Sequence, residues 1–399
     1  MGKASQRRLV IGLITCWSLL ISGVNYYTSS TTPVMPFTPP NLDSIHNPFS
    51  FIVYGDVQHS FNQGHNLLVK QMLREPAAFV FNTGDISPDN GQHYDRYFYP
   101  DIDELARRIP FFPSIGNHDV AWDSPFSRYP FQVFFHLTFN FLGRQPDNGH
   151  LLHPTSQKLW YSLVYGSSLF IVLDSNLFIN EGRYRRTHAL EPYRNYAQEQ
   201  LIWVRNLLEK ASRNPAFRSK FVFFHHSPFI TDETLPTPFF GGGHPGHRKM
   251  VVNLALPSDG SGKTTYLLDL FRLHGVSAVF TGHEHYYERW RETIRENGRP
   301  VRVLNWVVNG LGGVKPRGKP ECEQDDIKEF LKEDDACNFY LRRVANLHQD
   351  WRAELEHIYP TKETPSGRFH HYVLVTVDGP SIRFQTKDTE GKIRDQGFF

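Results

Sequence analysis

The sequence predicts an α/β fold, because short apolar runs rich in β-branched and aromatic residues alternate with helix-like stretches. The helix-like stretches carry apolar residues at three- and four-residue spacing; they are 65–76, 196–211 and 264–275. Many apolar runs end abruptly in Gly or a polar residue. Ligands of such sheets bind beyond the carboxyl ends of the strands, so these ends are the place to seek a functional site.

Five of the predicted strands end in side chains that can bind metals or take part in catalysis. They are 51–56 (FIVYGD), 79–85 (FVFNTGD), 111–119 (FFPSIGNHD), 220–228 (KFVFFHHSP) and 276–285 (VSAVFTGHEH). Further strands are predicted at 160–166, 169–175, 302–310 and 371–379. The sequence therefore predicts a sheet with polar residues gathered at one edge.

The composition argues against nucleic acid as the main partner. The chain has 399 residues, with 43 Lys and Arg against 41 Asp and Glu, for a formal net charge of +2. Proteins that bind nucleic acid normally concentrate basic residues on one surface, and this balance gives no strong sign of that. The length suits one large domain with insertions, or two domains.

The N-terminus reads as a targeting segment. Lys3, Arg7 and Arg8 precede an apolar stretch at 9–24, which favours a signal peptide or an N-terminal membrane anchor over residues 1–24. We therefore expect export, with the protein periplasmic or extracellular, or anchored to the membrane by its N-terminus. Residues 25–48 are rich in Thr, Ser and Pro and are expected to form an extended linker to a domain at 49–399.

A charged, helix-prone stretch at about 316–366 is predicted to be a helical insertion between two late strands. It could cover the site, contact a partner or simply form a solvated face. Cys322 and Cys337 lie within it. After export they could form a disulfide, although two free thiols are an open alternative.

Each polar strand end has an ordinary explanation when it is considered alone. Asp56 and Asp85 could be turn or cap residues, Asn117 a turn residue, and His225 a buried core histidine. Together the strand ends supply two carboxylates, an amide and several imidazoles, and clustered polar groups cost stability unless they are paired or bind a metal. Oxygen and nitrogen ligands without Cys suit manganese, iron or zinc in a site that is not a structural zinc site.

The ordered motifs GD, GD, GNHD, HH and GHEH resemble the calcineurin-like metallophosphoesterase superfamily, which includes the purple acid phosphatases. The resemblance covers residues 50–315. It implies a four-layer αββα sandwich with two central mixed β-sheets. It also implies two divalent metal ions that serve the hydrolysis of phosphate esters.

The resemblance implies one set of ligands for the first metal. Asp85 is expected to bridge both ions, and Asp56 and His285 are expected to hold the first. Most relatives have Asp-x-His in the first motif, whereas Gln58 stands here and His59 follows one place later. Gln58 can ligate through its amide oxygen, and a neutral ligand would leave the first metal more Lewis acidic.

The second metal is expected to be held by Asn117, His283 and one histidine of the 225–226 pair. Standing at the strand end favours His225, whereas counting back two residues from the following Pro favours His226. Purple acid phosphatases have Tyr three residues after the bridging Asp, but this position is Pro88. We therefore expect no tyrosinate ligand, and manganese or an iron–manganese pair is favoured over a purple iron centre.

The resemblance also implies a mechanism in which a metal-bound hydroxide attacks phosphorus directly. His118 is the expected proton donor to the leaving group. Asp119 could hold the imidazole of His118 in its charged form, or it could merely cap the following turn. Phosphomonoesters and phosphodiesters both remain possible substrates, because loops set specificity. The main alternative is a non-catalytic protein that binds a phosphate ligand on the same scaffold.

Overall fold

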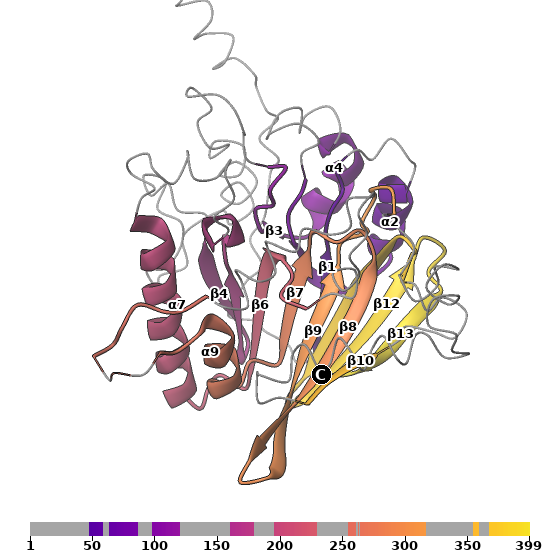
Figure 1. Cartoon of the computed structure of the whole chain (residues 1–399). Coiled ribbons are helices and arrows are strands. Elements are labelled where there is room, and N and C mark those ends of the chain that lie inside the picture. The colour runs from indigo at the N-terminus through magenta and orange to yellow at the C-terminus, as the bar shows by residue number, and fades with distance from the viewer. Residues whose placement is uncertain are drawn as a thin grey trace, which may run out of the picture. The chain divides into compact units, whose positions relative to one another are not determined.

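The strands form two mixed β-sheets, one of six strands and one of seven. The structure is a computed structural model. It describes residues 48–58, 64–86, 98–119, 160–178, 195–229, 254–260, 262, 264–316, 354–358 and 367–399. Figure 1 shows these residues in colour.

The six-stranded sheet has the order β13-β12-β11-β1-β2-β3. Neighbours β1, β2 and β3 are parallel, and β11, β12 and β13 add to them in antiparallel fashion. The bounds are β1 Phe49–Tyr54, β2 Ala77–Asn82, β3 Phe111–Pro113, β11 His371–Asp378, β12 Ser381–Asp388 and β13 Ile393–Phe398.

The seven-stranded sheet has the order β10-β8-β9-β7-β6-β5-β4. Its centre, from β5 through β6 and β7 to β9, is parallel, and β4, β8 and β10 are antiparallel to their neighbours. The bounds are β4 Tyr161–Tyr165, β5 Ser168–Val172, β6 Ser219–His226, β7 Ala278–Gly282, β8 Tyr287–Glu296, β9 Arg299–Asn309 and β10 Glu354–Ile358.

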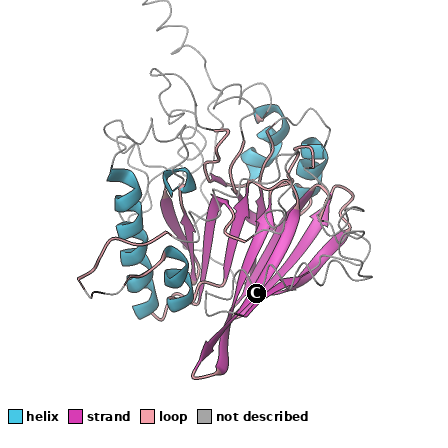
Figure 2. Cartoon of the chain, in the orientation of Figure 1, coloured by secondary structure: helices cyan, strands magenta, loops and turns pink. Residues whose placement is uncertain are grey.

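Helices cover the outer faces of the two sheets (Figure 2). Helices α7 (Tyr196–Arg213) and α9 (Leu267–Leu273) bury their apolar stripes in a cluster with the outer face of the seven-stranded sheet. Helix α2 (Gly64–Met72) contacts β11 of the six-stranded sheet and packs against α4 (Tyr99–Arg108). The result is the four-layer αββα sandwich that the motifs predict.

An aromatic core joins the two sheets. Phe81 of β2 stacks on Phe223 of β6, with ring centroids 4.0 Å apart and planes 13° apart. Phe221 and Phe223 face this shared core, while Val222 and Phe224 face the cluster with α7 and α9. Because β6 is buried on both faces, its sequence is a continuous apolar run rather than an alternating one.

The pattern of apolar runs predicted the interior strands and α7 correctly, but the insertion at 316–366 needs a correction. Residues 354–358 form β10, which pairs with β8 at the edge of the seven-stranded sheet. A short charged strand at a sheet edge has no continuous apolar run, so its sequence was mistaken for helix. The rest of 317–366, with Cys322 and Cys337, lies outside the described residues.

The N-terminal segment and linker at 1–47 likewise lie outside the described residues, so export, the anchor and the linker stay predictions. Within the described part of the chain, no helix is long and apolar enough to cross a membrane.

Candidate metal centre

The carboxyl ends of strands from both sheets meet at the candidate site. Asp56, Asp85 and Asn117 follow β1, β2 and β3 of the six-stranded sheet. The 225–226 pair ends β6 and His283 follows β7, both in the seven-stranded sheet. The sequence predicted that these residues share one edge of one sheet. Instead, two sheets supply them, because the parallel segments of both sheets end at the same place.

Three of these residues have strained backbone. Asp56, Asp85 and His283 have φ values of 57°, 54° and 72°. The other described non-glycine residue with positive φ is Asn297, in the turn between β8 and β9. Non-glycine residues rarely adopt this conformation, and strain of this kind concentrates at functional sites. The chain therefore bends sharply at the points where it presents these side chains.

Two glycines of the motifs permit close approach to the carboxylates. A Cβ at Gly116 would overlap Oδ1 of Asp85, and a Cβ at Gly282 would overlap Oδ2 of Asp56. Each glycine belongs to a different strand end from the carboxylate that it accommodates. The glycines of GNHD and GHEH therefore allow the strand ends to come together.

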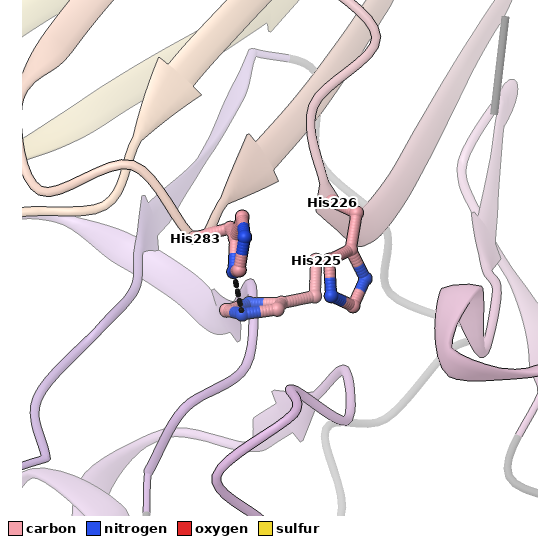
Figure 3. Close-up of side chains that lie close together, drawn as sticks. All are labelled: His225, His226 and His283. Atoms are coloured by element: carbon pink, nitrogen blue, oxygen red, sulfur yellow. Dashed lines mark hydrogen bonds between the residues drawn. The ribbon is translucent and has the colours of Figure 1, made fainter. Parts of the chain in front are cut away.

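Asn117, His225 and His283 form one cluster of ligand-type atoms. Figure 3 shows the two histidines of this cluster together with His226. The amide Oδ1 of Asn117 lies 2.9 Å from Nε2 of His225 and 2.9 Å from Nδ1 of His283. The two ring nitrogens are 3.3 Å apart, and Nε2 of His225 is 3.3 Å from Oδ2 of Asp85. A ring nitrogen of His226 lies within 4.8 Å of the ligand atoms of His225 and His283.

Asp56, Gln58 and His285 lie beside this cluster, across the carboxylate of Asp85. Nε2 of His285 is 3.8 Å from Oδ1 of Asp56 and 3.4 Å from the amide nitrogen of Gln58. That amide nitrogen donates to Oδ2 of Asp85 at 3.0 Å. Oδ1 and Oδ2 of Asp56 each accept the backbone N–H of His283 at 3.0 Å.

Backbone carbonyls orient two of the imidazoles. Nδ1 of His225 lies 2.9 Å from the carbonyl of Thr83, and Nδ1 of His285 lies 3.2 Å from the carbonyl of Lys315. A carbonyl only accepts hydrogen bonds, so both Nδ1 atoms carry a proton and both Nε2 atoms are left to face the site, where each could bind a cation once it holds no proton. Histidines that bind metals typically make this kind of contact through the other nitrogen.

His118 and Asp119 are held in the same loop. The backbone N–H of His118 donates to Oδ1 of Asp85 at 2.8 Å. The carboxylate of Asp119 accepts the backbone N–H groups of Asp85, Ile86 and Gly116 at 2.8, 2.9 and 2.8 Å. Asp119 therefore ties together the loops after β2 and β3, as a capping residue would.

A family model described as calcineurin-like phosphoesterase matches residues 49–287. The chain belongs to the calcineurin-like phosphoesterase family. The match begins at β1 and ends just beyond His285, so it spans all the strand ends that form the site.

Curated relatives of this calcineurin-like phosphoesterase carry the names of acid phosphatases. It is 24% identical over 318 residues to probable inactive purple acid phosphatase 9 of Arabidopsis thaliana, covering 70% of this chain and 42% of that protein. It is 27% identical over 217 residues to acid phosphatase type 7 of Mus musculus, covering 53% of this chain and 40% of that protein. The chain thus spans less than half the length of these curated relatives.

Solved structures show the same fold. Purple acid phosphatase PPD1 from yellow lupin (Lupinus luteus) seeds superimposes with a TM-score of 0.53 at 15% identity, covering 88% of this chain and 53% of that one. The arrangement of two mixed sheets with outer helices is therefore that of the calcineurin-like family.

The charges of the site favour bound cations. Burial raises the pKa of Asp85, but His225 and His118 attract its negative charge, and the pKa ends well below its usual range. Burial lowers the pKa of His225, but Asp85 and Asp56 outweigh it and raise this pKa to about 9. Without a cation, protons must offset two buried carboxylates, and a metal ion would supply the same positive charge.

The family is metal-dependent, and two groups of buried side chains in this chain can hold an ion. They are Asp56 with Asp85 and His225, and His225 with His226 and His283. Oε1 of Gln58 is buried and has no hydrogen-bond partner. Rotating this amide would turn an oxygen toward Asp85 and His285, so the residues present fit a divalent cation.

Arg289 does not face the site. It forms a buried ion pair with Asp395 of β13, at 2.8 Å between Nε and Oδ2, and its guanidinium lies over the ring of Phe384.

Sequence reasoning missed the buried polar residues Asp174, Ser175 and Asn176, which follow β5. This run has the same signature as the other motifs, a buried strand that ends in polar residues, and it could have been found by that signal.

Proposed function

We propose that the protein is a phosphoric ester hydrolase that uses two divalent metal ions. The observation that carries this proposal is the convergence of Asp56, Asp85, Asn117, His225 and His283 from five strands of two sheets, at hydrogen-bonding distances and with strained backbone at three of them. Such a cluster of buried polar groups destabilises the fold unless it binds a charged group such as a metal ion. Family membership supports the same activity.

The positions suggest which residue serves which ion. Asp85 lies between the two sets and is proposed to bridge the metals. Asp56, Gln58 and His285 would hold the first ion. The second would be held by Asn117 and His283 with His225, whose Nε2 already faces Asp85 and Asn117. We favour manganese or an iron–manganese pair over a purple iron centre, because the third residue after Asp85 is Pro88 and not a tyrosine.

The residues of the chain then bind and orient the ester. When bound, the two ions activate water and neutralise the charge of the phosphate group. His118 is half-buried, and its backbone is fixed by Asp85. Its imidazole is proposed to donate the proton that the leaving oxygen needs. Asp119 acts indirectly, because its carboxylate holds the loop that carries His118.

A non-catalytic protein that binds a phosphate ligand remains the second candidate, and one relative carries the word inactive in its name. The complete set of ligand-type residues and the presence of His118 favour catalysis. As a phosphoesterase, the protein would act on monoesters or diesters outside the cytoplasm, if residues 1–24 direct export.

Hydrolysis of p-nitrophenyl phosphate and of its bis ester, with Mn²⁺ and with chelator, tests the proposal. We expect turnover that chelation abolishes and Mn²⁺ restores, and we expect Asp85→Asn to reduce it at least about 100-fold. The control is Asp103→Asn, an equal change at an exposed residue of α4 that pairs with Arg107. Turnover that survives both Asp85→Asn and His118→Ala would exclude this site as its source.

A further inference from the structure

Ser175 contacts His226 twice. It begins the short helix η2 (Ser175–Phe178) that follows β5. Its hydroxyl oxygen lies 2.8 Å from Nδ1 of His226 and accepts the backbone N–H of His226 at 3.2 Å. Both side chains are fully buried, so water cannot replace these hydrogen bonds.

The partner of His226 differs in kind from those of the neighbouring imidazoles. His225 and His285 face backbone carbonyls, which only accept hydrogen bonds. A serine hydroxyl can donate or accept a hydrogen bond. Unlike a backbone carbonyl, it can be removed by substituting a single residue. The Nδ1 atom of His226 therefore faces a side chain, whereas those of His225 and His285 face the backbone.

The turn that carries Ser175 is itself fixed to the site. The side-chain nitrogen of Asn176 lies 3.3 Å from the carbonyls of both Ile115 and Gly116, in the loop that leads to Asn117. Gln200 of α7 accepts the backbone N–H of Asp174 at 2.7 Å and donates to its carbonyl at 3.0 Å. These contacts set the position of the Ser175 hydroxyl relative to the strand ends.

We propose that Ser175 is a positioning residue, whose hydroxyl sets the orientation in which the ring of His226 faces the metal centre. The hydroxyl holds Nδ1, so an ion would meet the ring at Nε2. A ring nitrogen of His226 lies within 4.8 Å of the ligand atoms of His225 and His283. Both histidines of the 225–226 pair then serve the metal centre. This inference rests on the proposed function, since it requires that the site binds metal.

The test compares Ser175→Ala with Ser175→Thr, which keeps the hydroxyl. The matched control is Ser168→Ala, which removes another fully buried hydroxyl, one bonded to Ser219 on β6. Binding of Mn²⁺ to metal-free protein is measured by calorimetry, with metal content after dialysis as a second reading. The ring ¹⁵N shifts of His226, assigned with His226→Gln, are measured in the metal-free protein.

We expect Ser175→Ala to weaken the binding of one of two Mn²⁺ equivalents about 10- to 100-fold. Ser175→Thr should restore the binding, and Ser168→Ala should bind as wild type does. The ¹⁵N shifts of His226 should change in Ser175→Ala alone. Unchanged affinity, or unchanged shifts, in a folded Ser175→Ala protein would overturn the proposal. If wild type binds no ion, the proposed function fails, while the shifts still decide whether Ser175 positions the ring.

Discussion

Gly116 stands where a side chain would collide with Asp85. A Cβ there would overlap both Oδ1 and the backbone nitrogen of Asp85. We expect Gly116→Ala to displace the proposed bridging carboxylate, to abolish metal retention and to destabilise the fold by about 1–3 kcal/mol, as overpacking does. Metal content and urea unfolding measure the two effects.

Gly260 provides the control for this substitution. Its φ is +84°, and a Cβ would meet nothing within 4 Å. Gly260→Ala should therefore cost about 1 kcal/mol through backbone strain and leave metal content unchanged. Full metal retention in Gly116→Ala would show that the close approach to Asp85 does not matter for the centre.

His118 is predicted to matter most for poor leaving groups. A proton donor stabilises a leaving oxygen in proportion to its basicity, so an alkoxide needs it more than p-nitrophenolate does. We expect His118→Ala to slow the hydrolysis of an alkyl phosphate by about 10²–10⁴-fold and that of p-nitrophenyl phosphate far less. Equal losses of kcat on both substrates would assign His118 to binding the phosphate group rather than to proton transfer.

At the scale of strands and helices, the ion pair between Arg289 and Asp395 connects the two sheets. Arg289 lies on β8 and Asp395 on β13, and both are buried. Asp395 also accepts the hydroxyl of Tyr287 at 2.8 Å. Removing one partner leaves the other charge buried and unpaired, so Arg289→Ala should cost roughly 3–5 kcal/mol in urea unfolding.

An exposed ion pair on α4 offers the comparison. Arg107 and Asp103 pair at 3.0 Å with both side chains about half exposed. Arg107→Ala should cost less than about 1 kcal/mol. Similar losses for Arg289→Ala and Arg107→Ala would mean that the buried pair adds no more than a surface pair does.

The sequence predicted the strands that carry motifs because a buried parallel strand is a continuous apolar run with an abrupt polar end. The runs that lead to Asp56, Asp85 and His283 have this form, and α7 has a clear helical period. Charged residues interrupt the strands β8, β10, β12 and β13, so their apolar patterns are weak. Ser175 also lies in a polar run after a buried strand, but a single hydroxyl there does not point to a metal site by itself, so it was missed.

At the scale of the whole molecule, the motifs predicted which residues meet but could not show which of the two sheets supplies each residue. Sequence order places Asp56 and His283 far apart, and only the pairing of strands decides which sheet each belongs to. The aromatic core between the sheets then brings both sets of strand ends together. The proposed metal pair would therefore hold the two sheets together, in addition to its role in hydrolysis.

His371 couples the stability of the whole fold to pH. Its ring is fully buried on β11 and packs edge-on against Tyr287 of the other sheet, at 5.1 Å between centroids. Nδ1 lies 2.8 Å from the carbonyl of Phe369, and Nε2 has no hydrogen-bond partner. Burial therefore lowers the pKa of His371 from 6.5 to about 4, because a second proton would have no acceptor.

The sign of the effect follows from this lowered pKa. The unfolded chain binds a proton near pH 6.5 and the folded chain only near pH 4, so this contribution to stability is complete above pH 6.5 and is lost as the pH falls toward 4. The loss amounts to roughly 3 kcal/mol.

The substitution His371→Asn tests this in metal-free protein. The asparagine should keep the hydrogen bond to Phe369, and its free energy of unfolding should fall less than that of wild type between pH 7 and pH 4.5. Parallel pH profiles for the variant and wild type would rule out His371 as the source.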